Sequence, residues 1–333
     1  MSPSGIKAII PAAGVGSRLR PHTHTTPKAL IHVAGKPILA HILDDLERLG
    51  VTDVVLVVGH MSDAIRTYVD AHYGHLNRSY VDQPERLGLG HAVRMTRDLV
   101  VGHPLFIVLG DTIFRADFSA VVNGGESAIG VHEVEDPRRF GIVETRDGVA
   151  SRLVEKPDQP TSNLAIVGVY YLTDSKLLFE ALDTLVAQDL RTKGEYQLTD
   201  ALQIMIEKGH RIRPFKVDGW YDCGKTETLL ETNRELLDHP AGPFPVFPAN
   251  GSIVIAPVAI DPSAVIEHSI VGPHVSIAAR AVVREAVVRN SIVNEDAVVE
   301  QILLEGSVIG ENALVRGNFR HLNVGDSSEV RMG

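Results

Sequence analysis

Cysteine is nearly absent from this sequence, and so are long apolar runs. Cys223 is the only cysteine among 333 residues, so no disulfide can form within the chain, as is usual in a reducing compartment. No apolar segment approaches the roughly 20 residues that a membrane-spanning helix requires. The first residues also lack the basic segment and apolar core of a signal peptide. We therefore expect a cytoplasmic protein without a membrane partner.

Acidic residues are missing from the first 43 positions, although the chain as a whole is acidic. Its net charge is −10, which argues against a general nucleic-acid-binding protein. The acid-free opening carries five basic side chains: Lys7, Arg18, Arg20, Lys28 and Lys36. A local excess of positive charge on an acidic protein predicts an anion-binding site. Chance composition is the alternative explanation.

Apolar runs and amphipathic segments alternate over most of the chain, which is typical of an α/β fold with a largely parallel sheet. Strands are expected at 6–12, 53–59, 104–111, 126–134, 140–145, 149–155 and 164–172. Helices are expected at 37–50, 61–74, 174–187, 195–209 and 225–237. The length of the chain favours two domains rather than one.

The composition changes at residues 239–250, where four prolines in twelve residues predict a semi-rigid linker. Beyond it, aliphatic triplets such as "AVI" at 264 and "AVV" at 281 recur in steps of five or six residues. Three steps span 16 or 17 residues. This register predicts a small parallel β-helix of hexapeptide repeats, with a β-sandwich as the alternative. The expected domains are therefore 1–238 and 251–333.

Two glycines and two cations occupy the loop that follows the first expected strand. Gly14 and Gly16 would let backbone N–H groups approach a phosphate, because no Cβ stands in the way. Arg18 can bind phosphate oxygens through two hydrogen bonds, and Lys28 adds a mobile positive charge. The third glycine of the dinucleotide fingerprint is absent, and no acidic residue closes the next strand. The loop therefore predicts a triphosphate site rather than an NAD site.

A second phosphate-binding pattern, "GWYDCGKT" at 219–226, fits the P-loop consensus. A P-loop needs a flexible turn rich in free N–H groups. Here bulky side chains and the carboxylate of Asp222 stand where the phosphate would lie. We interpret the match as accidental and expect Lys225 to begin a helix and face solvent.

The order of motifs over residues 6–237 resembles that of the sugar-1-phosphate nucleotidyltransferases. The loop "AAGVGSRLRPHTHTTPKAL" with "GKPIL" is similar to the pyrophosphorylase loop of that family. The similarity continues through "QPERLGLGHAV", "VLGD", "FGIVE", "EKP", "SNLAIVGVYYL", "KGEYQLTDAL" and "WYDCG". The tail resembles that of the long relatives of glucose-1-phosphate thymidylyltransferase. This resemblance implies a Rossmann-like nucleotidyltransferase domain with a mostly parallel sheet, followed by a left-handed parallel β-helix.

The resemblance also implies a reaction and its substrates. The phosphate oxygen of a sugar-1-phosphate, with glucose-1-phosphate as the expected sugar, would attack the α-phosphorus of dTTP or UTP and release pyrophosphate. Two polyanions must meet in this reaction, so cations must neutralise both. The catalytic group would comprise Arg18, Lys28, Asp111 and Asp222, and the last two would bind Mg²⁺.

The substrate-binding residues follow from the same matched motifs. The nucleotide would contact Ala13, Gly14, Gly16, Ser17, Arg18, Gln83 and Gly88. The sugar phosphate would contact Gly141, Glu155, Lys156, Lys193 and Trp220. Gln83 would read the base through one donor and one acceptor, and Gly88 would give that base room. Ala13, Ser17 and Thr112 depart from residues common in the family, which leaves the base and the subfamily open.

Structural alternatives exist for several of these residues. They are a helix cap for Asp111, a surface ion pair for Glu155 and Lys156, and an ordinary loop amide for Gln83. Glu195 is either a ligand or an acidic residue in the first turn of a helix.

Two alternative functions also stay open. An inactive regulatory subunit should have lost part of the catalytic group, which is complete here. A bifunctional enzyme would carry acetyltransferase activity in the β-helix, with His268, His274 and His321 as candidates, although the tail is short. The open end and apolar faces of the β-helix predict a homo-oligomer.

Overall fold

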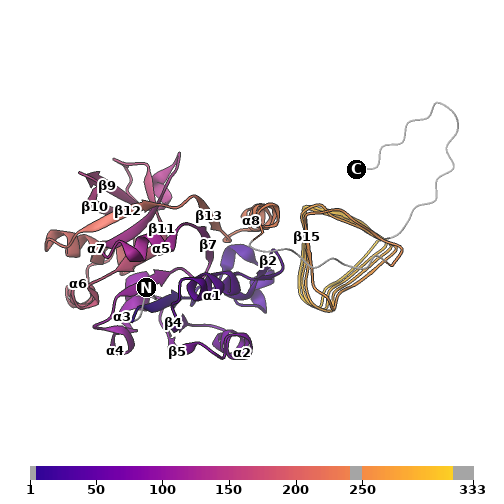
Figure 1. Ribbon diagram of the computed structural model, residues 1–333, viewed down its shortest axis with the longest axis horizontal. Helices are drawn as coiled ribbons and strands as arrows, with labels where there is room; N and C mark the ends of the chain where they lie inside the picture. The colour runs from indigo at the N-terminus through magenta and orange to yellow at the C-terminus, as the bar shows by residue number, and fades with distance from the viewer. Residues whose placement is uncertain (1–4, 241–249, 318–333) are drawn as a thin grey trace. The chain divides into compact units, whose positions relative to one another are not determined.

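The computed structural model describes residues 5–240 and 250–317 and divides into two units (Figure 1). The first unit contains residues 1–31 and 36–229, and the second contains residues 32–35 and 230–333. Most of the expected linker at 239–250 lies outside the described residues. The division between the units falls inside α8 (Thr226–Asp238).

A nine-stranded sheet forms the centre of the first unit. Its strands are β1 (Lys7–Pro11), β4 (Asp53–Val58), β5 (Asn77–Asp82), β6 (Leu105–Val108), β8 (Ser127–Glu133), β9 (Gly141–Arg146), β10 (Val149–Glu155), β11 (Leu164–Leu172) and β12 (Ile212–Lys216). The order is β10-β9-β11-β6-β1-β4-β5, and β8 joins β11 to β12. The four neighbouring strands β6, β1, β4 and β5 are parallel to one another. Strand β11 is antiparallel to β6, β8 and β9. The expected parallel sheet is thus found around β1, within a sheet that is mixed as a whole.

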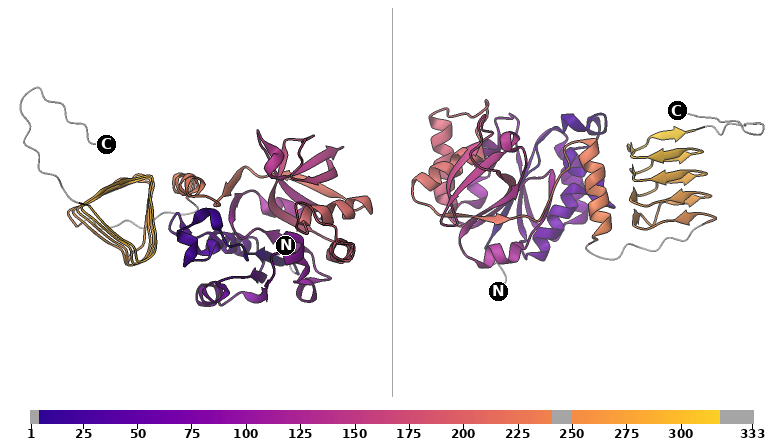
Figure 2. Two further views of the ribbon diagram at one scale, coloured as in Figure 1. Left: turned by 180° about the vertical axis from the view of Figure 1, so that it is seen from behind. Right: turned by 90° about the horizontal axis from the view of Figure 1, so that it is seen from above.

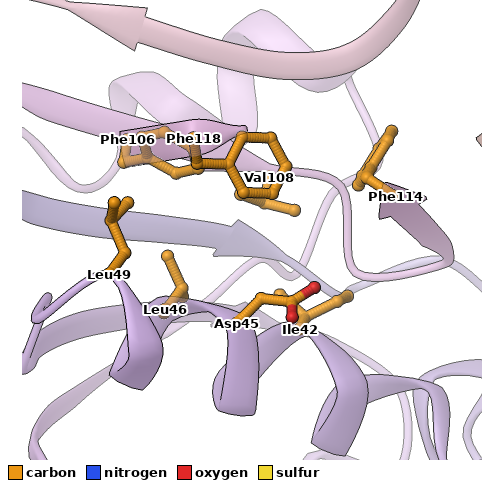
Figure 3. Close-up of a pocket in the computed structure, with 8 residues that line it drawn as sticks. All are labelled: Ile42, Asp45, Leu46, Leu49, Phe106, Val108, Phe114 and Phe118. Carbon is orange, nitrogen blue, oxygen red and sulfur yellow. The ribbon is translucent and has the colours of Figure 1, made fainter. Parts of the chain in front are cut away.

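Helices cover both faces of this sheet. They are α1 (Ile38–Arg48), α2 (Ser62–His72), α3 (Leu89–Arg94), α4 (Arg97–Val100), α5 (Phe118–Asn123), α6 (Ser175–Ala187) and α7 (Leu198–Glu207). Side chains of β6 alternate between the faces, as the pleat of a strand requires. Leu105 and Ile107 belong to the core that includes α3, α6 and α7, whereas Phe106 and Val108 line a cavity with α1 (Figure 3).

The boundaries of α1 follow from its sequence. Pro37 precedes the helix, where its missing N–H costs nothing, and Gly50 follows it with a φ of 79°. Ile42, Leu43 and Leu46 recur at helical spacing, and all three side chains are buried. None of the described helices combines the length and apolar character that spanning a bilayer demands.

Two short strands outside the main sheet pair with each other. Strand β7 (Thr112–Arg115) runs antiparallel to β13 (Gly219–Asp222), and Asp222 lies opposite Thr112. The loop after β1 contains three 3₁₀ turns, η1 (Ser17–Leu19), η2 (His22–His24) and η3 (Lys28–Leu30). A fourth turn, η4 (Pro137–Arg139), leads into β9.

The second unit contains a parallel β-helix with a triangular cross-section (Figures 1 and 2). One of its three four-stranded sheets contains β14 (Ile253–Val254), β17 (Ile270–Val271), β20 (Val287–Arg289) and β23 (Leu303–Glu305). The second contains β15 (Val258–Ile260), β18 (Val275–Ile277), β21 (Ile292–Val293) and β24 (Val308–Ile309). The third contains β16 (Val265–Glu267), β19 (Val282–Arg284), β22 (Val298–Glu300) and β25 (Leu314–Arg316).

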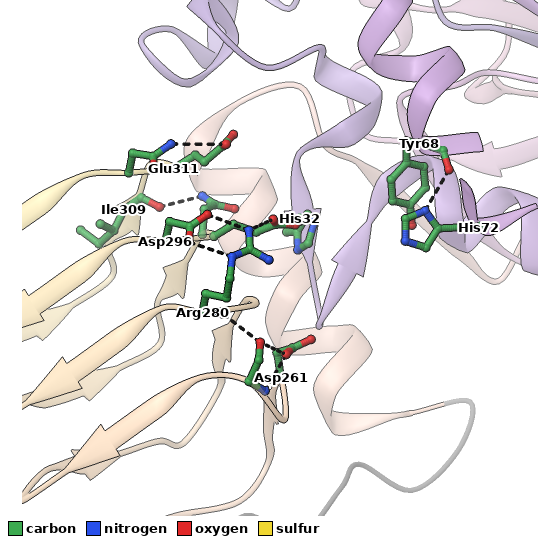
Figure 4. Close-up of polar contacts among 12 residues, drawn as sticks. His32, Tyr68, His72, Asp261, Arg280, Asp296, Ile309 and Glu311 are labelled. Carbon is green, nitrogen blue, oxygen red and sulfur yellow. Dashed lines mark hydrogen bonds and ion pairs between the residues drawn. The ribbon is translucent and has the colours of Figure 1, made fainter. Parts of the chain in front are cut away.

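The hexapeptide register is confirmed by the pairing between coils. Ile277 lies opposite Ile260 in the preceding coil and Val293 in the next, and these three side chains are buried in the interior. Ion pairs reinforce the corners from outside: Arg280 donates to Asp296 at 2.8 and 2.7 Å (Figure 4). The architecture is the left-handed parallel β-helix that the family resemblance implies.

A buried amide joins α8 to the β-helix within the second unit. Asn233 is fully buried, and its Oδ1 accepts hydrogen bonds from the Ala34 N–H at 2.9 Å and the Ser276 hydroxyl at 2.6 Å. Its Nδ2 donates to the His274 carbonyl at 3.1 Å. Every polar atom of this side chain thus has a partner, which a buried amide needs for stability.

The histidines considered for acetyl transfer lie at corners of the β-helix. His268 and His274 have φ angles of 50° and 60°, and the His274 ring is bound to Asp238 at 2.8 Å. His321 lies outside the described residues. No observation in the described part of the tail therefore favours an acetyltransferase site.

Candidate active site

The ends of two adjacent parallel strands bring the predicted catalytic residues together. The loop bearing Arg18 and Lys28 follows β1, and Asp111 follows β6. Parallel neighbours end at the same edge of a sheet, which is where open α/β sheets bind ligands. A hydrogen bond from the Gly110 N–H to the Pro11 carbonyl, 3.1 Å long, holds the two loops side by side.

Lys28 and Asp111 form an ion pair, with 2.6 Å between Nζ and Oδ2. The Lys28 side chain is only 7% exposed, whereas Asp111 is 42% exposed and reaches the cleft described below. Burial by itself would raise the pKa of Asp111. The Lys28 ammonium, the Thr112 hydroxyl and Arg18 outweigh that effect and hold the pKa below its ordinary value. Asp111 is therefore a carboxylate at neutral pH.

Asp222 approaches Asp111 through the pairing of β13 with β7. It lies opposite Thr112, and the next residue, Cys223, donates its backbone N–H to the Asp111 carbonyl at 3.3 Å. Within the described residues no three His, Cys, Asp or Glu side chains cluster as a metal site. A pair of carboxylates still fits Mg²⁺, which retains waters and takes its remaining ligands from substrate phosphates.

Arg18 lies beside Asp222 at Gly224. A Cβ on Gly224 would be 2.8 Å from Arg18 Nη2 and 2.7 Å from Asp222 Oδ1, so a larger residue would displace the ends of these two side chains. Gly16 is required, because its φ is 65° and a Cβ there would be 3.0 Å from the Lys28 Cβ. The loop is thus closely packed around its two cations.

The structure supports the interpretation of "GWYDCGKT" as an accidental P-loop match. Residues 219–222 are an extended strand paired with β7, so no phosphate-binding turn exists there. Lys225 is exposed and directly precedes α8, as expected. Asp222 is consequently the residue of interest in this motif.

A cleft with an empty volume of about 720 Å³ extends from these carboxylates toward β9 and β10. Five predicted site residues line it: Asp111, Gly141, Glu155, Trp220 and Asp222. Trp220 packs edge-to-face against Phe140, with ring centroids 4.9 Å apart, and gives the cleft an aromatic wall. A sugar ring would find both apolar and hydrogen-bonding surface here.

Glu155 is held at the floor of this cleft. Its Oε2 accepts from the Thr199 hydroxyl at 2.7 Å, and its Oε1 lies 3.4 Å from Lys156 Nζ. A Cβ on Gly141 would be 2.8 Å from Glu155 Oε2, so the glycine makes room for the carboxylate.

Lys193, with a φ of 53°, lies in a tight turn, and its Nζ is 3.1 Å from Asp158. Neither Lys193 nor Lys156 lines the cleft itself.

The residues expected around the base come from two loops, one after β1 and one between β5 and α3. Gln83 follows β5 and is 8% exposed, and its Nε2 lies 3.4 Å from the Gly88 carbonyl oxygen. The structure gives another reason for Gly88: its φ is 109°, and a Cβ would be 2.5 Å from the Tyr196 carbonyl oxygen. The glycine therefore permits close backbone packing against Tyr196. Ala13 is buried, and its Cβ would lie 3.0 Å from a Cβ added to Gly59.

Gly14 and Ser17 lie in the loop after β1. A Cβ on Gly14 would meet no other atom within 4 Å, so this residue borders open space, which suits an approaching phosphate. Ser17 begins η1, directly after the left-handed Gly16.

Sequence reasoning did not single out several residues of the cleft. Thr199, Arg139 and Gln197 line it, and Thr199 orients Glu155. Thr199 and Gln197 stand in the quoted motif "KGEYQLTDAL", and Arg139 precedes "FGIVE". Motif membership was therefore the available signal, but only the fold shows that these side chains face the cleft.

The apolar cavity of Figure 3 is distinct from the cleft. It is lined by side chains of α1, β6, β7 and α5, with Asp45 as its one charged residue. None of the predicted site residues lines it.

Comparisons with known proteins agree with this geometry. A family model described as Nucleotidyl transferase matches residues 7–239. A glucose-1-phosphate thymidylyltransferase of Streptomyces griseus is 33% identical, and the match covers 98% of this chain and 95% of that protein. The UTP–glucose-1-phosphate uridylyltransferase AglF of Haloferax volcanii is 34% identical over 69% of this chain and 96% of its own. The nucleotidyltransferase Agl11 of the same organism is 37% identical over 70% of this chain and 66% of its own.

A solved structure shows the same fold. It is a Bacillus anthracis protein described as a putative glucose-1-phosphate thymidylyltransferase, and it superposes with a TM-score of 0.62 and 26% identity over 72% of this chain and 98% of its own. The match of the family model and the full-length match to the Streptomyces griseus enzyme decide the classification. The chain belongs to the nucleotidyl transferase family and is an enzyme of the sugar-1-phosphate nucleotidyltransferase type.

Proposed function

We propose that this enzyme transfers a nucleotidyl group from dTTP or UTP to glucose-1-phosphate, giving an NDP-glucose and pyrophosphate. The observation that carries the proposal is the match along 98% of the chain, tail included, to a glucose-1-phosphate thymidylyltransferase. Because the chain is also similar to a UTP–glucose-1-phosphate uridylyltransferase, we include uracil as well as thymine as the base.

The side chains of the site suit a transfer between two polyanions. Arg18 and Lys28 would neutralise the triphosphate, and Lys156 and Lys193 the phosphate of the sugar. Glu155, already oriented by Thr199, would accept hydrogen bonds from sugar hydroxyls. A phosphate oxygen of the sugar-1-phosphate then forms a bond to the α-phosphorus, while the bond from that phosphorus to the pyrophosphate breaks.

Asp111 and Asp222 would hold a divalent cation, and enzymes of this family generally use one. A cation held by these two residues would neutralise negative charge on the triphosphate. Lys28 partly neutralises Asp111, with 2.6 Å between Nζ and Oδ2. An inactive regulatory subunit is disfavoured, because the catalytic group is both complete and assembled.

The experiment is a matrix of dTTP, UTP, CTP, ATP and GTP against glucose-, galactose-, mannose- and N-acetylglucosamine-1-phosphate. Pyrophosphate release is measured with Mg²⁺ present, and Asp111→Asn serves as the inactive control. The highest kcat/KM should belong to dTTP or UTP with glucose-1-phosphate. A preference for a purine nucleotide or for another sugar would refute the corresponding half of the proposal.

We also infer that the enzyme is a homo-oligomer that associates through its β-helix. An aliphatic ladder runs along the outside of the sheet β14-β17-β20-β23, formed by Ile253, Ile270, Val287 and Leu303 in register. Ile253 is 60% exposed and Leu303 is 76% exposed. Ile270 and Val287, between them, are half-buried. An aliphatic ladder with exposed ends favours association with another surface.

A further inference from the structure

His91 contacts the residue expected to read the base. Gln83 follows β5, and its backbone N–H donates to the Val58 carbonyl at 2.7 Å. This hydrogen bond fixes the position of the Gln83 backbone. His91 lies on α3, half-buried, and its Nδ1 is 3.3 Å from Gln83 Nε2. The Gly88 carbonyl oxygen lies 3.4 Å from the same nitrogen. Two groups of the protein therefore face one end of the Gln83 amide.

The chemistry of these two groups determines which way the amide points. A backbone carbonyl only accepts hydrogen bonds, so Gly88 favours an amide whose NH₂ group is on this side, and His91 shares that role. His91 can receive the second hydrogen of that group only through an Nδ1 that carries no proton. Burial, together with the nearby Arg94, lowers the pKa of His91, and Glu85 opposes this shift only in part. The ring is therefore neutral at pH 7 and available as an acceptor.

We propose that His91 is a positioning residue for base selection: by accepting from Gln83 Nε2, it leaves the amide oxygen as the atom that faces the base. This inference rests on the proposed function and on the expectation from the family resemblance that Gln83 lies at the base. It also revises the expectation that Gln83 offers the base both a donor and an acceptor.

An amide oxygen facing the base distinguishes uracil and thymine from cytosine. Uracil and thymine present an N3–H donor, whereas cytosine presents a bare N3 acceptor at the same place. Two acceptors that face each other leave both unpaired, and such a mismatch typically costs a factor of about 10 to 100 in binding. UTP and CTP have the same ring size and shape, so their ratio of kcat/KM isolates this effect.

The test compares that ratio in the wild type and three variants. His91→Phe keeps a ring but removes the acceptor, so the UTP:CTP ratio should fall about tenfold. The change should appear mainly in the KM for UTP, because the base is remote from the reacting phosphorus. His91→Asn places an amide oxygen near the former Nδ1 and should keep the ratio within a factor of about three. His72→Phe, the same exchange on α2, should leave it unchanged.

The outcomes separate this inference from the proposed function. If the wild type uses neither UTP nor dTTP, the proposed function is refuted and the inference falls with it. If the wild type prefers them and His91→Phe keeps the full UTP:CTP ratio, the inference alone is refuted. An equal fall of the UTP:CTP ratio in His91→Phe and His91→Asn would also refute the inference, because the ratio would then depend on packing and not on the acceptor. An ¹⁵N NMR spectrum of the wild type must show His91 protonated at Nε2; a protonated Nδ1 would contradict the hydrogen bond.

Discussion

Lys28 and Asp111 lie 83 residues apart in the sequence, and their side chains are joined by a 2.6 Å ion pair at the edge of the sheet. The pair puts a nearly buried cation against one of the two carboxylates that we assign to Mg²⁺. Lys28 would bind phosphate oxygens of the triphosphate, and Asp111 would hold the metal. This geometry leads to the first prediction.

We predict that Lys28→Ala and Arg18→Ala each lower kcat by about 10²- to 10³-fold, because each removes one preorganised charge from the reacting phosphates. Steady-state kinetics at saturating substrates provides the measurement. Circular dichroism should show an intact fold in both variants. Arg20→Ala, an exposed arginine of the same loop, is the matched control and should retain most activity. Near-normal rates in both site variants would contradict the assignment.

A second prediction concerns the metal. Asp111→Asn and Asp222→Asn should both lose activity or require much more Mg²⁺, because each replaces a charged ligand by a neutral group of equal size. Product formation is titrated against Mg²⁺ for each variant.

Lys225→Ala is the control for this titration, because the exposed lysine lies three residues from Asp222. It should behave like the wild type. An inactive Lys225→Ala beside an active Asp222→Asn would restore the P-loop interpretation of residues 219–226.

Local sequence patterns predicted the main sheet and its first helices closely. The strand expected at 53–59 is Asp53–Val58, and the helix expected at 37–50 is Ile38–Arg48. Burial of a strand or of one helix face imposes a period on the sequence, so these elements can be recognised locally. The 16- and 17-residue coils of the β-helix were predictable for the same reason.

Elements that depend on distant partners were not predicted. Strands β7 and β13 contain four residues each, and only their mutual pairing makes them a sheet. The helix expected at 195–209 begins at Leu198 instead, because residues 192–195 form a tight turn. The hydrogen bond from Thr199 to Glu155 spans 44 positions and appears in no local pattern.

That hydrogen bond gives the third prediction. Thr199→Val keeps the shape of the side chain but removes the donor that orients Glu155, so the KM for sugar-1-phosphate should rise about tenfold. Glu155→Gln should have a larger effect, because the group that accepts from the sugar hydroxyls loses its charge. The KM for the nucleotide should change little in both variants. Thr184→Val, on the exposed face of α6, is the control.

The fourth prediction tests the buried amide of the second unit. Asn233→Ala would leave the Ala34 N–H and the Ser276 hydroxyl without their acceptor, which should lower the free energy of unfolding by about 2–3 kcal/mol. Denaturant titration measures the loss, and faster hydrogen exchange at the Ala34 amide should accompany it. Arg234→Ala, an exposed neighbour, should leave both quantities unchanged. Unaltered exchange at Ala34 in Asn233→Ala would contradict the role of this side chain.

The last prediction concerns the aliphatic ladder on the β-helix. Leu303 is 76% exposed at the end of this ladder, so Leu303→Glu should weaken association by placing a charge in an apolar contact. Multi-angle light scattering should report a smaller particle, and a chain without residues 250–333 should be at least as small. Some transferase activity should persist in both, because the cleft is built entirely from residues of the first unit. Arg289→Ala, an exposed residue of the same sheet, is the control. If Leu303→Glu and the truncated chain keep the wild-type number of subunits, association through the β-helix is excluded.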